Sequence, residues 1–451
     1  MNPHVFREYD IRGHAERDFD DSFVRALGLS LGTFFTERGL KRIGIGRDCR
    51  LSSPRLHEAL CAGLIETGLQ LVDIGVGPTP LLYFAVHELD LDGGVQITGS
   101  HNPPDENGFK MMVGKGSLYG DDIEELRTVM ENERFHRAAG GSIEAIDPTP
   151  AYVKRAQEDI QLGRRDIRFA IDAGNGAGGP LALQTTRALG LNPVAMLCDM
   201  DGTFPVHHAD PTEPETLEML IDRVVKDGLE LGFAYDGDAD RVGVVDARGE
   251  VIWGDKLMII LSRALLKNHP GATIIGEVKC SQTMYDDIEA HGGRGVLWKT
   301  GHSLIKTKMK EEKALLAGEM SGHIFFADRY YGFDDAIYAT LRILEIVSHS
   351  DVPLHEMLAD VPQTFATPEI RVDCDDARKF ELVQQIVDHY RPTHALIDID
   401  GARIQFEGGW GLVRASNTQP VLVLRFEADT EAGLESIRSE VESVLGRFRS
   451  S

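Results

Sequence analysis

The sequence predicts an α/β protein made of three related α/β domains followed by a C-terminal α+β domain. The chain has 451 residues, of which 42% are hydrophobic. It is too long for a single core and suits several domains of about 100–150 residues each. A strand–helix–glycine–strand pattern occurs three times, and the pattern changes in the last part of the chain. Length, repetition and this change together predict the fold class.

Each copy of the repeated pattern begins with a short apolar run that is typical of a buried strand. A helical stretch, a glycine and a second apolar run follow, as in a βαβ unit. The copies are strand 42–48, helix 56–67, Gly68 and strand 69–74; strand 168–173, helix 181–189, Gly190 and strand 193–197; and strand 272–278, helix 284–290, Gly292 and strand 295–298. Such repetition predicts related domains, each with a βαβ-type mixed sheet.

The C-terminal region has short strands separated by glycine-rich turns, and a helix on either side of them. The strands are expected at 395–399, 403–406, 411–415 and 421–427, and the helices at 375–390 and 430–448. This pattern predicts an antiparallel sheet with helices. Proline-marked joints near residues 148 and 362 suit domain boundaries. We expect domains at residues 1–146, 147–250, 251–362 and 363–451.

Composition excludes several classes of function. Lys and Arg number 47 against 72 Asp and Glu, giving a formal net charge of -25, which argues against a nucleic-acid or anionic-membrane binder. No apolar stretch approaches the roughly 18–20 residues of a membrane helix. The five cysteines are scattered and never in CxxC spacing, which favours a reducing compartment. We expect a soluble cytoplasmic enzyme, with no coiled-coil face to indicate more than a monomer or weak homo-oligomer.

A serine loop follows the apolar run that ends at Ile97. Ser100 has His101 beside it and Lys110 ten residues further on, and glycine and proline bound the loop. This context exposes the hydroxyl and suits a nucleophilic or phosphate-carrying serine. Ser-His-Asn-Pro is also typical of a surface turn, and the loop lacks the paired glycines of the hydrolase elbow. The residues alone leave both interpretations open.

Three aspartates follow a second apolar run, at alternate positions. In an extended loop, alternate side chains share a side, so Asp236, Asp238 and Asp240 can converge on one cation. The residues after them, Arg241 and Ala247, do not fit an EF-hand. Closely spaced carboxylates repel one another unless a metal neutralises them. The pattern therefore predicts a Mg²⁺ site that leaves a position for a phosphate oxygen, with three solvated aspartates as the alternative.

Two further loops carry dense polar groups. Residues 414–418, with the sequence RASNT, place an arginine, two hydroxyls and an amide between two strands, which suits phosphate binding. Residues 318–323, with the sequence GEMSGH, place an acid, a hydroxyl and an imidazole at alternate positions, which suits hydrogen bonds to sugar hydroxyls. Each loop also fits an ordinary polar turn.

The glycine pattern at residues 174–179 fits the dinucleotide fingerprint GxGxxG. It follows a predicted strand, opens a helix and has Asp199 downstream, as in an NAD-dependent oxidoreductase. That interpretation gives no function to the serine, aspartate and arginine loops. Glycines at this turn also allow close helix–strand packing, so NAD binding is the more distant alternative.

Taken together, the motifs resemble those of the α-D-phosphohexomutase superfamily, in the same order along the whole chain. The matching segments are 6–13 (FREYDIRG), 98–110 (TGSHNPPDENGFK), 236–241 (DGDADR), 318–323 and 414–418. The residue sequences of the serine and GEMSGH loops are similar to those of the bacterial phosphomannomutase/phosphoglucomutase branch. The phosphoglucosamine mutase branch, which usually has an alanine–serine pair at the serine loop, is the alternative.

The resemblance implies a fold of three α/β domains and a TATA-box-binding-protein-like domain around a central cleft. It also implies that the enzyme interconverts hexose 1-phosphates and 6-phosphates, of mannose, glucose or both. Ser100 would carry a phosphoryl group, a hexose 1,6-bisphosphate would be the intermediate, and glucose 1,6-bisphosphate would act as an activator. The sugar then turns end for end within one site. Because the hydroxyl at C2 is not read, both glucose and mannose are expected substrates.

The resemblance also assigns roles to individual residues. Ser100, Asp236, Asp238 and Asp240 would hold Mg²⁺. Arg12 and Arg241 would supply fixed positive charge, His101 would lie next to the nucleophile, and Lys110 and His323 are candidates for proton transfer. The residues that would bind the sugar phosphate are Tyr9, Lys279, His302, Glu319, Ser321, Arg414, Ser416, Asn417 and Thr418. Basic groups gathered in one cleft would let an acidic chain bind an anionic substrate.

Overall fold

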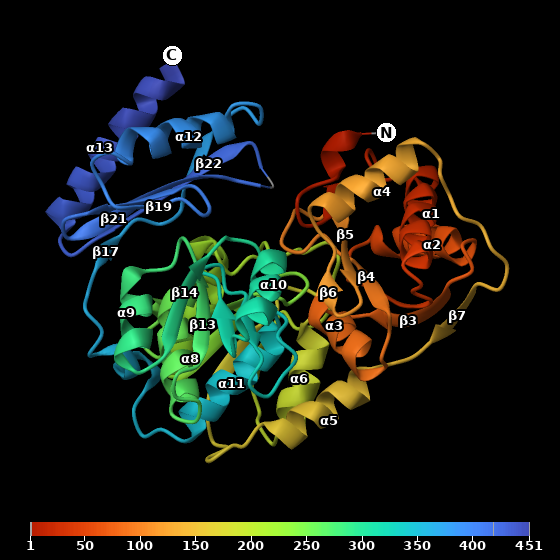
Figure 1. Ribbon diagram of the computed structural model, residues 1–451. Coiled ribbons are helices and arrows are strands. Elements are labelled where there is room, and N and C mark those ends of the chain that lie inside the picture. The colour runs from red at the N-terminus through yellow and green to blue at the C-terminus, as the bar shows by residue number, and fades with distance from the viewer. Residues whose placement is uncertain (1, 418, 451) are drawn as a thin grey trace.

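The computed structural model describes residues 2–417 and 419–450, and these form four β-sheets with helices packed on them (Figure 1). Three mixed sheets follow one another along the chain, and the last sheet is entirely antiparallel. The predicted fold class, three α/β units and a C-terminal α+β unit, is confirmed.

The first unit has a seven-stranded sheet with the order β1-β5-β4-β2-β3-β7, and β6 pairs with β5. Its strands are β1 (Ile11–His14), β2 (Arg42–Arg47), β3 (Gln70–Val76), β4 (Gly93–Ile97), β5 (Glu106–Val113), β6 (Gly116–Ser117) and β7 (Ser142–Ala145). Its helices are η1 (Pro3–Val5), α1 (Asp21–Glu37), α2 (Ser53–Ile65), α3 (Thr79–Glu88) and α4 (Asp121–Glu131). The first predicted repeat corresponds to β2, α2 and β3, whose strands pair in parallel.

The second and third units repeat this plan on a smaller scale, with the orders β12-β11-β10-β8-β9 and β14-β13-β15-β16. The second comprises α5 (Thr149–Asp159), β8 (Phe169–Asp172), α6 (Gly179–Ala188), β9 (Val194–Met196), α7 (Pro214–Asp227), β10 (Leu231–Tyr235), β11 (Val242–Asp246) and β12 (Val251–Ile252). The third comprises α8 (Gly254–Leu266), β13 (Thr273–Glu277), α9 (Gln282–Ala290), β14 (Arg294–Trp298), α10 (His302–Glu312), β15 (Leu316–Gly318), β16 (Ile324–Phe326), α11 (Ala336–Ser348) and η2 (Leu354–Leu358).

The C-terminal unit has the sheet order β17-β22-β21-β20-β19, and β18 pairs with β22. It comprises β17 (Phe365–Ala366), β18 (Ile370–Asp373), α12 (Lys379–Tyr390), β19 (Leu396–Ile397), β20 (Ala402–Phe406), β21 (Gly409–Ala415), β22 (Val421–Ala428) and α13 (Glu431–Ser450). The expected strands and helices are present. Strands β17 and β18 were not predicted, because they are short and largely exposed and therefore lack a clear apolar pattern.

The first three units share one structural device, which is a hairpin at the edge of the parallel strands. In each unit a strand pairs in parallel with an earlier strand and antiparallel with the strand that follows it. The hairpins are β4–β5, β10–β11 and β15–β16. Their connecting loops are the serine loop, the aspartate loop and the GEMSGH loop. The repeated fold therefore presents three different candidate site loops from equivalent positions.

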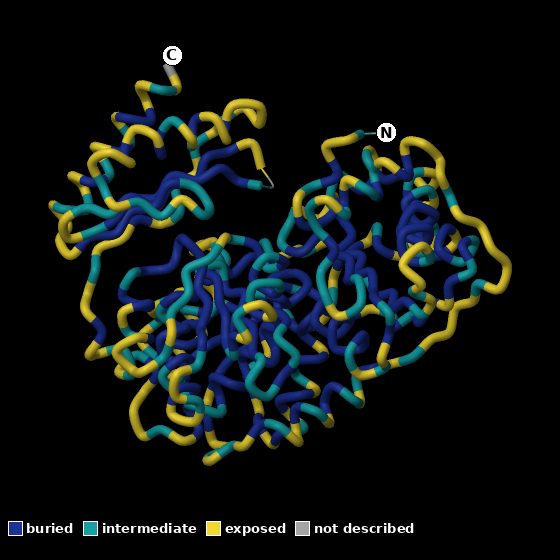
Figure 2. Tube along the Cα trace, viewed as in Figure 1, coloured by how far each residue is buried: buried dark blue, intermediate teal, exposed yellow. Residues whose placement is uncertain are grey.

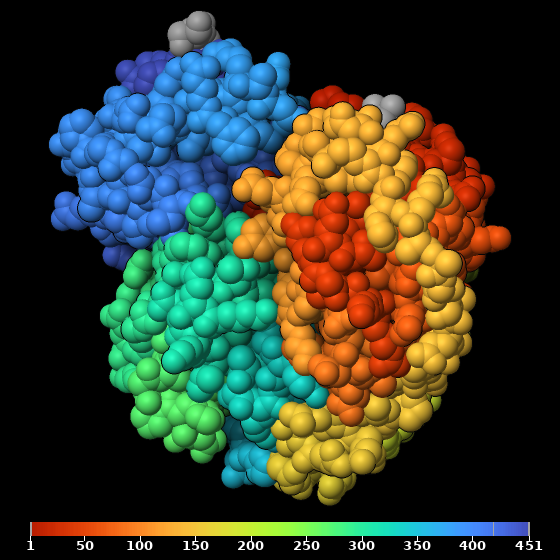
Figure 3. All heavy atoms as spheres, turned by 45° about the vertical axis from the view of Figure 1, so that its right-hand side comes forward, coloured from red at the N-terminus to blue at the C-terminus, as the bar shows by residue number. Residues whose placement is uncertain are grey.

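The hydrophobic cores distinguish the C-terminal unit from the rest. One continuous core combines side chains from all of the first three units, and the first unit also has a second core of its own. Within the described residues, the core of the C-terminal unit shares no side chain with the other units. A small cluster of Val278, Trp410 and Leu412 joins it to the third unit. Figure 2 shows buried segments following the sheets, and Figure 3 shows the C-terminal unit, in blue, seated mainly on the green third unit.

No helix in residues 2–417 and 419–450 is long and apolar enough to cross a membrane. Each of the five cysteines is a free thiol.

Candidate active site

Ser100 lies in the β4–β5 loop with its side chain turned toward the aspartate loop of the second unit. Its Oγ lies 3.1 Å from Asp236 Oδ2 and 3.3 Å from His101 Nδ1. The residue is 3% exposed and has a φ of 51°, a left-handed conformation that is uncommon for residues other than glycine. The Oγ1 atom of Thr98 accepts a hydrogen bond from the Ser100 N–H and supports this conformation. The structure thus holds the serine hydroxyl in one strained, inward-facing position.

The three aspartates of the β10–β11 loop are fully buried and face one another. One carboxylate oxygen from each of Asp236, Asp238 and Asp240 lies within 4.8 Å of the others. Lys110 from β5 donates to Asp238 at 2.7 Å and also to Asp240. The side chain of Thr79, at the start of α3, donates to Asp238 as well. Two of the loop's carboxylates are therefore paired with residues of the first unit.

The electrostatics and unfilled bonds of this cluster fit a divalent cation. Burial, reinforced by Asp240 and Asp238, raises the pKa of Asp236 well above its usual range. The Oδ1 atoms of Asp238 and Asp240 are buried and make no hydrogen bond within the described residues. Buried, convergent carboxylate oxygens with free lone pairs are the ligands that Mg²⁺ prefers. The buried cluster is therefore a candidate metal site, as expected.

Positive side chains surround the serine and the aspartates. Arg12 on β1 pairs with Asp10 and donates to Asn102 Oδ1 at 3.3 Å, within the serine loop. The Nε atom of Arg241 lies 3.8 Å from Asp236 Oδ2. Burial, followed by these arginines and Lys110, lowers the pKa of His101 well below its usual range, so this imidazole is neutral. Local positive charge is thus concentrated where an anionic substrate would approach a chain of net charge -25.

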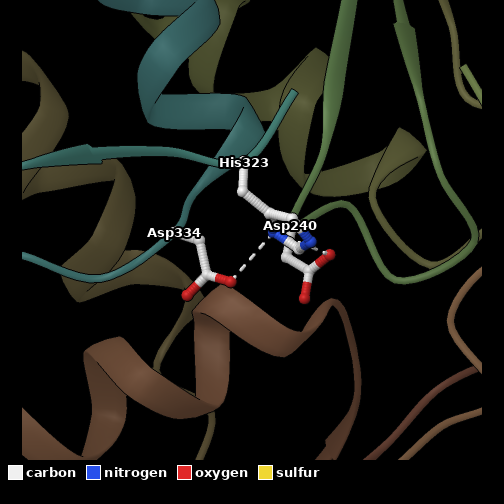
Figure 4. Close-up of side chains that lie close together, drawn as sticks. All are labelled: Asp240, His323 and Asp334. Atoms are coloured by element: carbon white, nitrogen blue, oxygen red, sulfur yellow. Dashed lines mark ion pairs between the residues drawn. The ribbon is translucent and has the colours of Figure 1, made fainter. Parts of the chain in front are cut away.

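His323 in the β15–β16 loop lies beside Asp334 and Asp240 (Figure 4). Arg241 Nε donates to its Nε2 at 3.1 Å, while its Nδ1 lies 3.0 Å from Asp334 Oδ2 and 3.6 Å from Asp240 Oδ1. Because Nε2 accepts, the proton lies on Nδ1 and faces the carboxylates. The ring of His302 stacks on that of His323, with 5.5 Å between the ring centroids. Burial and the charge of Lys306 lower the pKa of His302 to about 4. His323 is therefore oriented with its Nε2 lone pair toward the arginine side of the site.

Glu319, in the same loop, faces the start of α10. Its Oε1 accepts the N–H of Gly301 at 2.6 Å, and burial raises its pKa. Ser321 is partly exposed. Gly322, with a φ of 94°, approaches the backbone of Val242 so closely that a Cβ would lie 2.4 Å from its oxygen. This close approach joins the GEMSGH loop directly to the strand that follows the aspartates.

The Arg414 loop connects β21 and β22 in the C-terminal unit and reaches the other units through side chains. Arg414 Nε lies 3.1 Å from Asp400 Oδ2, and the same oxygen accepts the N–H of Thr300 at 2.9 Å. Asn417 donates to the hydroxyl of Tyr9 at 2.6 Å, and that hydroxyl donates to the carbonyl of Thr300 at 3.0 Å.

Ser416, Thr418 and Lys279 are further residues predicted to bind the sugar phosphate. Ser416 Oγ accepts the N–H of Gln419 at 3.2 Å, within the same loop. Thr418 lies outside the described residues. Lys279 follows β13 and pairs with Glu369 at 3.0 Å, across the junction between the third and C-terminal units.

Family models match the chain in four consecutive segments. They describe phosphoglucomutase/phosphomannomutase α/β/α domain I at residues 3–137, domain II at 150–249, domain III at 253–365 and the C-terminal domain at 369–444. The chain belongs to the phosphoglucomutase/phosphomannomutase family. This confirms the resemblance on which the sequence analysis relied, and with it the four-domain phosphohexomutase fold.

Individual relatives agree along the full length. The chain is 43% identical to the phosphomannomutase/phosphoglucomutase of Pseudomonas aeruginosa strain PAO1, over 99% of this chain and 96% of that protein. It is 42% identical to the phosphoglucomutase of Neisseria gonorrhoeae, over 98% and 96%. Among solved structures, a phosphoglucomutase/phosphomannomutase family protein of Burkholderia thailandensis superposes with a TM-score of 0.93 at 40% identity, over 98% of this chain and 97% of that one.

The glycine-rich loop at residues 174–179 has a structural function in this family member. The N–H of Ala177 donates to the carbonyl of Gly237 at 2.9 Å. A Cβ on Gly176 would lie 2.7 Å from that same carbonyl, and one on Gly178 would lie 2.4 Å from the Cβ of Ala239. The aspartate loop therefore packs against these glycines, where a dinucleotide pyrophosphate would have to approach. This packing removes the basis for the NAD interpretation.

Sequence reasoning missed several residues that organise the site. Asp334 orients His323, Asp400 contacts Arg414, and Thr79 contacts Asp238. Each lies outside the recognised motifs, in a turn or at a helix end. Thr79 follows a Gly-Pro turn that opens α3, which was a usable signal for a loop near the site. Nothing local distinguishes Asp334 from the neighbouring helix cap Asp335.

Proposed function

We propose that this protein reversibly converts hexose 1-phosphates into hexose 6-phosphates, using both glucose and mannose, through a phosphorylated Ser100 and a hexose 1,6-bisphosphate. The observation that carries the proposal is the position of the Ser100 hydroxyl, 3.1 Å from a buried aspartate cluster and beside Arg12, Arg241 and Lys110. The relatives named above are phosphomannomutases and phosphoglucomutases, which supports the same activity.

The protein's own side chains account for binding at both ends of the sugar. Arg414, Ser416 and Asn417 would hold the phosphate that is not being transferred, and Thr418 would complete this loop. Glu319 and Ser321 would hold the 3- and 4-hydroxyls, while Lys279, His302 and Tyr9 would line the same space. Since no group is assigned to the C2 hydroxyl, glucose and mannose would both be accepted, with kcat/KM values within about 100-fold.

Phosphoryl transfer would occur at Ser100. Asp236, Asp238, Asp240 and the Ser100 oxygen would hold Mg²⁺, which neutralises charge on the group being transferred. Arg12 and Arg241 would provide fixed positive charge on the same group, and the neutral His101 would pack beside the nucleophile. Because the phosphoryl group moves from Ser100 to one hydroxyl and returns from the other, glucose 1,6-bisphosphate would reactivate enzyme that has lost its phosphate.

Of the two candidates for proton transfer, the contacts favour His323. Its Nε2 is an acceptor, because it receives the N–H of Arg241. Burial alone would lower the pKa of Lys110, but Asp238 and Asp240 outweigh it and raise that pKa, so the side chain stays an ammonium. His323 would therefore accept the proton of the attacking sugar hydroxyl at Nε2, where that hydroxyl would replace the Arg241 N–H, and Lys110 would stabilise charge.

The remaining aspects of the proposal concern the whole molecule. We place the domain boundaries near residues 146, 250 and 362, as the sequence indicates. Five free thiols suit a reducing cytoplasm. No interaction with nucleic acid or membrane is proposed, and the protein would act as a monomer or weak homo-oligomer.

The test is to follow the purified protein by ³¹P NMR with Mg²⁺, glucose 1,6-bisphosphate and, in separate samples, glucose 1-phosphate, mannose 1-phosphate and glucosamine 1-phosphate. Intact mass and phosphopeptide mapping would locate the phosphate on Ser100. We expect 6-phosphate products from glucose and mannose. A strong preference for glucosamine 1-phosphate would favour phosphoglucosamine mutase, and an active protein phosphorylated elsewhere would refute the role of Ser100.

A further inference from the structure

Arg50, in the loop between β2 and α2, is among the most deeply buried charged residues of the molecule. It is 1% exposed, and its guanidinium lies directly behind the serine loop. One η nitrogen donates to the carbonyls of Ser100 and Asn102, at 2.9 and 2.6 Å. The other donates to the carbonyls of Pro103 and Glu106, the latter at 2.9 Å. One side chain thus binds four carbonyl oxygens across the loop between β4 and β5.

The charge of Arg50 is balanced by Asp48, two residues before it, which holds the loop from the other side. Asp48 Oδ2 lies 3.2 Å from Arg50 Nε and accepts the N–H of Gly99 at 3.1 Å. Its Oδ1 accepts the Arg50 N–H and the hydroxyl of Ser53. The pair therefore presents four donors from Arg50 to the carbonyls of the loop and one acceptor from Asp48 to a backbone N–H of the loop. Only a forked guanidinium can provide the four donors from a single side chain.

The same contacts explain how Ser100 keeps its left-handed backbone. A residue with a side chain remains at a φ of 51° only where its surroundings over-determine it. Here Thr98 binds the Ser100 N–H, Arg50 binds its carbonyl, and Gly237 packs against that carbonyl, where a Cβ would lie 2.3 Å away. The position of the hydroxyl is therefore set by groups that do not touch it.

Arg50 also contacts the second unit. Its guanidinium carbon lies 5.1 Å from the centre of the Phe204 ring, and its backbone pairs with Gly202. Through Arg50, the serine loop is held in position relative to the unit that carries the three aspartates. A distance of 3.1 Å between Ser100 and Asp236 depends on that alignment.

From this geometry we infer that Arg50 is a positioning residue for phosphoryl transfer: it fixes the Ser100 hydroxyl relative to the aspartate cluster without contacting substrate. The inference rests on the proposed function. If it holds, disturbing Arg50 slows the transfer step while leaving the grip on the substrate phosphate intact, because the Arg414 loop belongs to a different unit. A displacement of about 1 Å at a reacting group lowers the rate roughly 100-fold.

The experiment compares Arg50→Lys and Gly99→Ala with wild type. Lysine keeps the charge opposite Asp48, but one nitrogen cannot bind four carbonyls. Gly99→Ala leaves Arg50 intact and disturbs the same contact from the loop, since its Cβ would lie 2.5 Å from the guanidinium carbon. The matched control is Arg55→Lys on α2, which removes an arginine that binds the carbonyls of Phe19 and Ala15, away from the serine loop.

The readouts are thermal unfolding, steady-state kcat and KM for glucose 1-phosphate, and the single-turnover rate at which unphosphorylated enzyme takes phosphate from glucose 1,6-bisphosphate. We expect both variants to lose about 10- to 100-fold in kcat and in the single-turnover rate, with KM within about threefold of wild type. Arg55→Lys should retain kcat within about twofold.

Wild-type kcat in either folded variant, or a rise in KM that equals the loss in kcat/KM, would overturn the inference. If Arg50→Lys does not fold, Gly99→Ala decides the question. If wild type itself converts no hexose phosphate, the proposed function fails instead, so the two failures are distinguishable.

Discussion

The side of the site that would transfer the phosphoryl group and the side that would hold the substrate phosphate are built differently. Between the first two units, Lys110 and Thr79 pair with the buried aspartate loop, and Gly237 packs directly on the carbonyl of Ser100. The Arg414 loop reaches the first unit through the hydrogen bond between Asn417 and Tyr9. One side is interlocked through a shared core, and the other is attached to a unit with its own core.

This difference matches the two demands of the proposed reaction. Transfer requires fixed geometry, because catalysis falls steeply when reacting groups are displaced. Reorientation of a bisphosphate requires space that opens and closes without releasing the sugar, which suits a separately packed unit. Changes near Ser100 and the aspartates, which form the transfer side, should therefore reduce kcat. Changes in the Arg414 loop, which forms the gripping side, should weaken the retention of substrate and intermediate.

The largest effect is expected for Ser100→Ala. Removing the hydroxyl eliminates the only entry to the covalent relay, so kcat should fall at least about 1,000-fold. The fold and the aspartate cluster should survive, because the Ser100 backbone contacts do not use the hydroxyl. A coupled assay, circular dichroism and Mg²⁺ titration measure the three properties. Activity within tenfold of wild type would contradict the assignment.

Asp238→Asn should have the next largest effect on kcat. The change removes one of three clustered carboxylates, so Mg²⁺ should bind more weakly and kcat should fall about 100-fold. The metal-free protein should stay folded, because Lys110 still pairs with Asp240 and the loss also relieves repulsion between the carboxylates. Magnesium titration of activity and thermal unfolding in chelator measure the effect. Full wild-type activity in excess chelator would show that the cluster has no catalytic metal.

The contrast between the two sides also marks what sequence alone could establish. The proposed roles of the serine, the aspartates and Arg414 could be inferred from the sequence, because each motif is contiguous and neighbouring residues indicate its chemistry. The alternation of strands and helices likewise predicted the three mixed sheets. Arg50 and Asp334 were not predictable. Arg50 contacts Ser100, which lies 50 residues further along the chain, and Asp334 contacts His323, which lies in a different turn. Packing in three dimensions, which no local pattern encodes, brings them to these partners.

Arg414→Ala tests the gripping side. Losing its contact with phosphate should cost about 2–4 kcal/mol, or roughly 30- to 1,000-fold, mainly as a rise in KM. Glucose 1,6-bisphosphate should also escape during turnover, so that added bisphosphate restores the rate. The measurement is bisphosphate released per product formed. Normal KM without release would indicate that the loop is only a polar turn.

The smallest effect is expected for Tyr9→Phe, which removes a single oxygen between the two sides. That hydroxyl accepts from Asn417 and donates to the carbonyl of Thr300, so it joins the Arg414 loop to the first and third units. A hydrogen bond of this kind is worth about 1 kcal/mol, or roughly fivefold. We expect KM and bisphosphate release to rise by about that factor, with the single-turnover phosphorylation of Ser100 unchanged, because the serine and aspartate loops keep all their contacts. The matched control is Tyr119→Phe, which removes a hydroxyl that bonds to Thr307 instead. If Tyr9→Phe slowed phosphorylation of Ser100 while KM stayed constant, the two sides would be coupled through Tyr9 rather than separable.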